Sequence, residues 1–141
     1  MPIYPTAGST LTSLLVGRSA LKSGDQSVTS STTLVNDSAL ALPLTGGVQY
    51  SFTCWLYIVG TTAKVTFTFG GSGQWSQPNG GTVVTASGTT VTAAAGGWLI
   101  AGTVTAASGG DTLQLEWAQS SSSGTATTVK GGSILTTLRM S

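Results

Sequence analysis

Histidine is absent from this chain of 141 residues. Without it, the Ser-His-Asp and Cys-His nucleophile arrangements cannot form, and the commonest zinc ligand is missing. The four acidic residues are dispersed, and no two of them lie within four positions of each other, which disfavours both a metal cage and a catalytic carboxylate pair. The sequence therefore predicts a protein that is not an enzyme, with no catalytic residue, no metal site and no cofactor. These acids are Asp25, Asp37, Asp111 and Glu116.

Charge of either sign is also scarce. Charged residues make up 6% of the chain, against roughly 25% in an ordinary soluble domain. The five Lys and Arg residues are scattered and form no basic patch for nucleic acid. A free monomer normally keeps its net charge away from zero, yet this chain carries +1. This composition favours a surface that is largely covered in a permanent assembly.

Cysteine and long apolar runs are the other two shortages. The single cysteine, Cys54, excludes an internal disulfide and is interpreted as a small buried apolar residue. No apolar run approaches the roughly 20 residues of a membrane-spanning helix. The N-terminus lacks an early basic region, and the apolar group 14–16 is too short for a secretory signal. We expect a protein made in a cytoplasm that has no membrane partner and leaves only inside a larger assembly.

The polarity that is present comes mainly from Ser and Thr, beside 20 Gly, and this mixture favours strands and turns. The stretch 48–58 is the centre of the predicted fold. Side chains on a strand point alternately to opposite faces, and every second position of this stretch is apolar or aromatic. It therefore predicts one long strand with a continuous core face, formed by Val48, Tyr50, Phe52, Cys54, Leu56 and Ile58.

The opposite face of this strand changes character along its length. It is polar as far as Thr53 and then aromatic at Trp55 and Tyr57. An outward aromatic pair indicates that another layer or another subunit covers it. The alternative is a strand buried on both faces of its own sandwich. We take Thr53, Trp55 and Tyr57 as the candidate subunit interface.

Short alternating segments continue through residues 25–141. Segments 64–69, 98–105, 112–118 and 133–140 alternate most clearly, and Gly-rich turns separate them. Eight to ten short strands without a convincing helix are typical of a β-sandwich or barrel. The fold class is therefore predicted as all-β, an antiparallel β-sandwich formed by residues 25–141.

Residues 1–24 differ from the rest because Pro2 and Pro5 discourage regular structure and Gly17 weakens a short helical spacing. This segment is predicted to be an extended N-terminal arm that becomes ordered on a partner. A frayed tail or a leading strand is the alternative. The candidate docking residues of the arm are Ile3, Tyr4, Leu11, Leu14, Leu15 and Arg18.

Trp75 lies between two glycine-rich segments, 70–73 and 77–81. This setting predicts a loop with Trp75 near its tip, where the ring could stack on a sugar or anchor a protein contact. Trp75 is accordingly the candidate exposed loop contact. The alternative is a ring that folds back as a lid on one end of the sandwich.

Two parts of the chain resemble small virion proteins of tailed bacteriophages. The first runs from Asp25 through Leu34 to Leu42 and the triplet 50–52, and the second from Asp111 to Gln119, followed by a Ser/Thr-rich loop, the triplet 131–133 and a final apolar strand. The resemblance covers residues 25–140. It implies a trimeric jelly roll similar to the C1q and tumour-necrosis-factor folds, used on a phage head or tail, and it implies no catalytic residue.

Three functions follow as hypotheses. The first is a capsid decoration or head-fibre protein: a homotrimer that docks through its arm on the major capsid protein or other virion proteins, made in the bacterial host cytoplasm and located in the virion. The second is a tail-associated receptor-binding or adhesion module that contacts host surface glycans. The third is a free carbohydrate-binding module or accessory domain of an enzyme.

Overall fold

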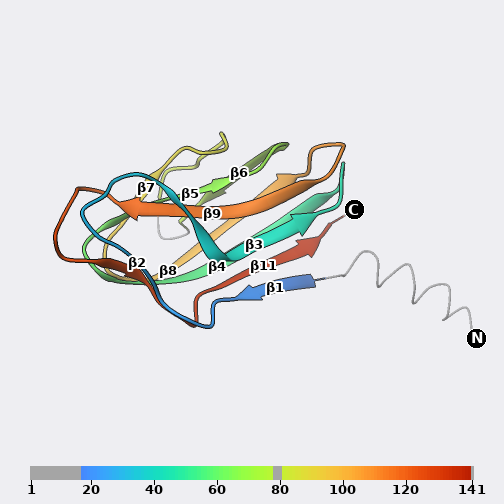
Figure 1. The fold of residues 1–141 in the computed structure, drawn as a ribbon. Coiled ribbons are helices and arrows are strands. Elements are labelled where there is room, and N and C mark those ends of the chain that lie inside the picture. The colour runs from blue at the N-terminus through green and yellow to red at the C-terminus, as the bar shows by residue number, and fades with distance from the viewer. Residues whose placement is uncertain (1–16, 78–80, 141) are drawn as a thin grey trace, which may run out of the picture.

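The computed structural model describes residues 17–77 and 81–140, and these residues form eleven strands and no helix. Two antiparallel sheets lie face to face as a sandwich (Figure 1). The predicted fold class is confirmed, with one strand more than the predicted upper limit of ten. The strands are β1 (Gly17–Leu21), β2 (Gln26–Val28), β3 (Val35–Leu44), β4 (Gln49–Gly60), β5 (Ala63–Thr68), β6 (Ser72–Ser76), β7 (Val91–Ala93), β8 (Gly96–Thr105), β9 (Asp111–Gln119), β10 (Thr127–Val129) and β11 (Ile134–Arg139).

The larger sheet has seven strands and is built around β4. One edge of β4 pairs with β8, which in turn pairs with β6. The other edge pairs first with β11 and then with β10, beyond which lie β1 and β2. The smaller sheet has the order β3-β9-β5-β7. The long strand predicted over 48–58 is thus the centre of the larger sheet.

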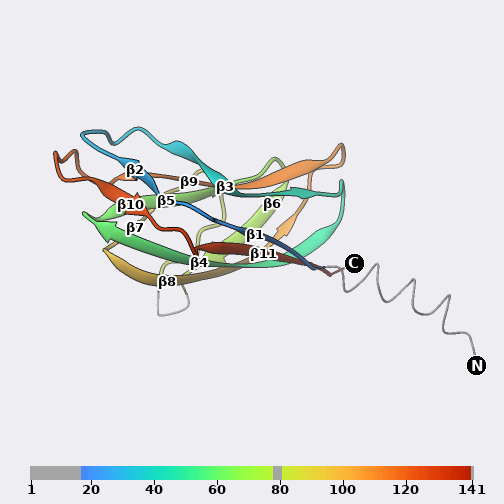
Figure 2. The ribbon, with the colours of Figure 1, turned by 60° about the horizontal axis from the view of Figure 1, so that its bottom comes forward.

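The chain passes repeatedly from one sheet to the other, so neighbours within a sheet are distant in sequence. The strands β1, β11, β4 and β8 form one four-stranded layer, and β3, β9, β5 and β7 form the layer that faces it. This arrangement is that of a double-sheet jelly roll. The start of β1 lies beside the end of β11 at one end of the sandwich, with Gly17 opposite Leu138 (Figure 2).

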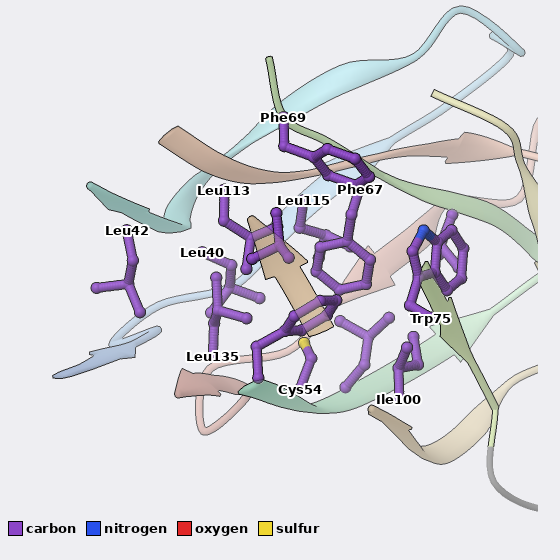
Figure 3. Close-up of a cluster of buried hydrophobic side chains, with 14 of the residues drawn as sticks. Leu40, Leu42, Cys54, Phe67, Phe69, Trp75, Ile100, Leu113, Leu115 and Leu135 are labelled. Carbon is purple, nitrogen blue, oxygen red and sulfur yellow. The ribbon is translucent and has the colours of Figure 1, made fainter. Parts of the chain in front are cut away.

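The core confirms the predicted alternation. All six inward positions of β4 and its preceding residue, from Val48 to Ile58, are at most 8% exposed. Phe52 meets Phe67 of the facing sheet with ring centroids 5.1 Å apart, and Figure 3 shows the leucines of β3, β9 and β11 beside Cys54. Burial raises the pKa of the Cys54 thiol to about 12, with a smaller contribution from the charge of Asp37. The thiol is therefore protonated at neutral pH and acts as a packing group.

The predicted boundary of the arm at residue 24 is wrong. Residues 17–21 form β1, which pairs over its whole length with β11. Arg18, one of the candidate docking residues, therefore belongs to the sandwich and lies opposite Thr137. Pairing with β11, more than a hundred residues away in sequence, fixes this segment. The other docking candidates, Ile3, Tyr4, Leu11, Leu14 and Leu15, lie outside the described residues.

The prediction that Trp75 is an exposed loop contact is also wrong. Trp75 lies in β6 and is 2% exposed. Its ring packs edge-on against Phe67, with centroids 5.2 Å apart (Figure 3). β6 can approach β8 this closely because Gly102 has no side chain: a Cβ there would lie 2.6 Å from the Cβ of Trp75. Gly102 of β8 thus permits close strand packing at a position where the glycines flanking Trp75 in sequence indicated a loop.

One carboxylate joins two turns at an end of the sandwich. Asp111 accepts hydrogen bonds from the backbone N–H groups of Gly70, Gly71, Ala107 and Thr112 at 2.7–3.1 Å. Partial burial acts to raise the pKa of Asp111, but these four hydrogen bonds outweigh it and hold the pKa below its ordinary value. Ionised Asp111 therefore stabilises the folded protein.

The sign of this pKa shift predicts how stability depends on pH. A carboxylate whose pKa is lower in the folded state stabilises the fold at every pH above its unfolded-state pKa. This stabilisation is lost as the pH falls through the folded-state pKa. We expect Asp111→Asn to lower the melting temperature at neutral pH, and the gap between variant and wild type to narrow as the pH falls below about 4. Thermal unfolding followed by circular dichroism across this range measures both. A gap that stays constant down to the acid limit would contradict the assignment.

Candidate interaction face

The outward side of β4 is exposed where the sequence predicts a subunit contact. Trp55 is 46% exposed, Tyr57 43% and Val59 46%, and Thr53 is exposed beside them. These residues alternate with fully buried neighbours, so all of them lie on the outer face of the seven-stranded sheet. The alternative interpretation, in which β4 is buried on both faces of its own sandwich, is wrong.

Trp55 lies in the middle of an apolar line that crosses four strands. It lies between Ile134 of β11 and Leu99 of β8, and Ile134 lies opposite Leu21 of β1. Residues directly opposite each other in antiparallel strands share a face, so these four side chains form one row. Three strand spacings make this row about 14 Å long. We call Leu21, Ile134, Trp55 and Leu99 the apolar row.

Tyr57 and Val59 extend the apolar row along β4. A Cβ on Gly97 would lie 3.5 Å from the Tyr57 ring, so the ring lies across the backbone of β8, where there is no side chain beneath it. The Tyr57 backbone N–H donates to Ser133 Oγ at 3.0 Å, and its carbonyl accepts from the Lys130 N–H at 2.9 Å. These bonds hold β4 where its partner changes from β11 to β10.

The other half of this face is polar but uncharged. Thr53 lies between Ala101 of β8 and Thr136 of β11. Thr136 shares a hydrogen bond of 3.1 Å with Ser19 of β1. Hydroxyl groups continue toward the end of the sheet, where Ser51 lies opposite Thr103. Leu138 of β11 also lies on this half, opposite Ser51, and is 38% exposed. The face therefore combines an apolar half with a half in which hydroxyl groups predominate.

No charged side chain lies on this face over the five strands β1, β11, β4, β8 and β6. The exposed pair of Asp25 and Lys130 lies at its border, where the Lys130 N–H donates to the Tyr57 carbonyl. The chain has five Lys or Arg and four Asp or Glu residues, nine in all, and all nine fall within the described residues. Lys22 and Asp37 form a buried ion pair, and Asp25 and Lys130 form an exposed pair at one end. Asp111 joins two turns, and Lys64 and Glu116 lie on the outer face of the other sheet. Arg18 and Arg139 face inward at one end of the sandwich. We call the outer side of β1, β11, β4, β8 and β6 the charge-free face.

The size of the charge-free face suits a specific interface. Five neighbouring strands at about 4.8 Å spacing, followed for some 30 Å, give an area on the order of 600 Å². A standard protein interface buries about 800 Å² on each partner. Within this area, the apolar row and Tyr57 supply the large apolar and aromatic side chains that act as anchors in known interfaces.

The apolar row could be predicted only in part from the sequence. Trp55 was identified through the alternation of β4, but Leu21, Ile134 and Leu99 were not. Leu21 falls within the segment predicted as the arm, and the alternation of segment 133–140 does not show which side of that strand faces outward. Only the strand order places these residues next to Trp55.

Among the described residues, no group of three or more acidic or cysteine side chains is placed to hold a metal ion. No helix in this part of the chain is long and apolar enough to cross a membrane. Asp25, Asp37 and Asp111 instead make structural contacts. Asp25, for example, binds Lys130 at 2.7 Å, and this hydrogen bond, followed by one from the Gly131 N–H, lowers its pKa.

No protein-family model matches the chain, and no curated protein matches it. Among solved structures, it is similar to the CBM22-1-GH10 modules of the N-terminal endo-1,4-beta-D-xylanase 10B of Clostridium thermocellum, complexed with xylohexaose, at 14% identity and a TM-score of 0.43. It is also similar to the VP2 subviral particle of infectious bursal disease virus, at 9% identity and a TM-score of 0.24. These matches cover 90% and 89% of this chain, but only 28% and 40% of those chains. Neither likeness bears on what this chain binds.

Proposed function

We propose that this protein is a non-enzymatic structural component of a phage virion, a capsid decoration or head-fibre protein that forms a homotrimer through its charge-free face. The observation that carries the proposal is the exposure of Trp55 in the apolar row and of Tyr57 next to it, on the charge-free face. The scarcity of charge in the whole chain supports a permanent assembly. The phage assignment and the trimer come from the resemblance of residues 25–140 to small virion proteins.

A second copy of this chain fits the charge-free face better than a charged partner does. Complementary charges normally set the choice of a different partner, and this face offers none. In a trimer the residues nearest the threefold axis meet their own copies, so any charge on them would meet its own sign. An apolar and hydroxyl-bearing face lines such an axis without this repulsion, and its aromatic side chains supply the anchors.

The subunit contact can be tested with two matched threonine substitutions. Thr53→Arg places a charge on the charge-free face, and Thr112→Arg places one at an exposed position of β9 on the opposite sheet. We expect the wild type and Thr112→Arg to have the mass of a trimer and Thr53→Arg to have that of a folded monomer. Sedimentation equilibrium measures the mass, and circular dichroism checks the fold. A wild-type monomer, or a Thr53→Arg variant that stays trimeric, would refute this contact.

The attachment to the virion has its own test. Because β1 begins at residue 17, removing residues 1–16 leaves every described strand intact. We propose that this deletion keeps the trimer but abolishes binding to purified phage particles, which cosedimentation measures. Electron microscopy of the native particle locates the full chain on the head or the tail. Absence of the protein from every particle would rule out the virion function.

Glycan binding is the second candidate function, favoured by the placement of two exposed rings. Trp55 and Tyr57 lie two positions apart on one strand, about 7 Å along it, with hydroxyl groups beside them. Exposed aromatic rings of this kind stack on sugar rings. Trp75 cannot serve this purpose because it is buried. This function would be favoured over assembly if the wild type were a stable monomer that binds soluble glycans and the Trp55→Ala variant did not bind them.

A further inference from the structure

A shallow hollow lies on the charge-free face between β6 and β8, and its volume is about 150 Å³. The strand register places Gln74 opposite Thr103 and Ser76 opposite Ala101. Ala101 also lies opposite Thr53, so these side chains point to the outer side of the sheet. The two short side chains, Ser76 and Ala101, form the floor of the hollow, and longer neighbours surround it.

The walls of the hollow are uncharged and fixed. Val83 supplies an exposed apolar wall, and Gln74 and Thr103 supply polar ones. Backbone hydrogen bonds in both directions between Val84 and Trp75, at 2.8 and 2.9 Å, hold the segment that carries Val83 against β6. No charged residue of the described chain lines the hollow. It therefore offers a neutral and partly apolar surface to another molecule.

Leu21 lies at the opposite edge of the same face, at the end of β1. It is 63% exposed, more than any other large hydrophobic side chain of the described residues. Its backbone is nevertheless held in place, because the N–H of the next residue, Lys22, donates to the Ser133 carbonyl at 2.9 Å and the Lys22 carbonyl accepts from the Gly132 N–H at 2.7 Å. An apolar group on a fixed backbone loses little freedom on binding. Leu21 is therefore suited to anchor a contact.

Leu21 and the hollow match in size, but they are far apart within one chain. An engineered leucine-to-alanine cavity in a protein core measures about 150 Å³, the same volume as the hollow. β1 and β6 are the outermost of the five strands of the charge-free face (Figure 1). Four strand spacings of about 4.8 Å separate them by roughly 19 Å. Leu21 can therefore reach only the hollow of another copy.

We propose that Leu21 of one copy fills the hollow of the next, so that three copies form a closed ring. In such a head-to-tail arrangement each copy gives its Leu21 to one neighbour and receives Leu21 of the other, and a threefold rotation closes the ring. Both parts lie on the charge-free face, so the contact is continuous with the subunit interface proposed above. The inference rests on the proposed trimer and deepens it, because it names the residues that meet.

A pair of cysteines tests the contact in the full chain. Because Gln74 lines the hollow, Leu21→Cys/Gln74→Cys should form disulfides between neighbouring copies on oxidation, while the two positions are too far apart for a disulfide within one copy. We expect a trimer on a denaturing, non-reducing gel and a monomer after reduction. Each single variant should give no covalent trimer, nor should Leu21→Cys/Thr112→Cys, which has one cysteine on the opposite sheet. Cys54 is buried and does not take part.

Filling the hollow is the second test. Ala101→Trp places a ring in the hollow, and we expect it to weaken trimer formation at least about tenfold in sedimentation equilibrium. Its side chain points outward, so circular dichroism should show the fold unchanged. Thr112→Trp adds the same ring to the opposite sheet and should leave the trimer intact.

The outcomes separate this contact from the trimer itself. The inference stands only if the cysteine pair gives the covalent trimer and Ala101→Trp weakens assembly. A wild-type trimer in which either result is missing would overturn the contact and leave the proposed function standing. A wild-type monomer would overturn both. Covalent species that stop at two copies, or continue beyond three, would overturn the closed ring.

Discussion

Replacing Asp37 with alanine is expected to lower the free energy of unfolding by about 3–5 kcal/mol, since the change breaks a buried ion pair by removing one partner. The Asp37 carboxylate is fully buried and accepts four hydrogen bonds. Oδ1 accepts from Lys22 Nζ at 3.1 Å and from the backbone N–H groups of Ala39 and Leu40 at 2.9 and 3.0 Å. Oδ2 accepts from Trp117 Nε1 at 3.1 Å. Alanine leaves all four donors without this acceptor.

The position of Asp37 in β3 explains why the fold needs a carboxylate there. The pairing of β3 with β9 is interrupted between Asn36 and Ala41, so the ladder does not provide acceptors for the backbone in between. The Asp37 side chain replaces them. It also neutralises Lys22, which is 2% exposed and holds the chain after β1 against the sandwich. One side chain therefore joins β1, β3 and β9.

Three substitutions rank the contributions within this cluster. Asp37→Ala should lower the free energy of unfolding most. Asp37→Asn should lower it less, because the amide oxygen of asparagine still accepts hydrogen bonds from the backbone. Lys22→Met also leaves a buried charge without its partner, but it should lower the free energy of unfolding less than Asp37→Ala, because Asp37 then keeps three of its four donors. Asp25→Asn is the matched control, because it removes a carboxylate from an exposed ion pair, and such pairs contribute little. Urea denaturation of all four gives the ranking. If Asp37→Ala were no more destabilising than Asp25→Asn, the buried cluster would not have the stabilising role assigned to it.

The core strands could be predicted because each has one buried and one open face. In β4, β5 and β9 the apolar residues recur at every second position, and the structure buries those positions. Thr and Val propensity alone was less informative. Residues 82–92 are rich in Thr and Val, yet the only strand they enter is β7 (Val91–Ala93), apart from a single bridge between Val84 and Trp75. Propensity describes how well a side chain fits a sheet, and here no neighbouring strand pairs with most of the segment.

The contacts that define the candidate interaction face depend on residues far apart in sequence. β1 has little apolar alternation, and its role follows only from its pairing with β11. The same pairing completes the apolar row through Leu21. Alternation within one segment shows which residues share a face. It does not show which strands lie side by side, and this determines where the charge-free face is formed.

Trp75→Ala is expected to lower the free energy of unfolding by about 3–5 kcal/mol, the usual range for removing a large buried ring. Trp75→Phe should cost far less, since it keeps an aromatic contact with Phe67 and removes an indole N–H that is buried without an acceptor in the described part of the chain. Such an unpaired donor is itself unfavourable by about 1–3 kcal/mol, which offsets part of the lost packing. Guanidinium denaturation of both variants measures the difference.

Trp55→Ala provides the matched control, because it removes the same side chain from an exposed position. It should leave the stability of the folded monomer nearly unchanged but weaken the assembly, whereas Trp75→Ala should weaken folding itself. The two tryptophans therefore separate the two roles of the seven-stranded sheet: its inner side holds the sandwich together, and its outer side is available to another molecule. Equal effects of the two substitutions on monomer stability would show that the charge-free face is part of the chain's own core.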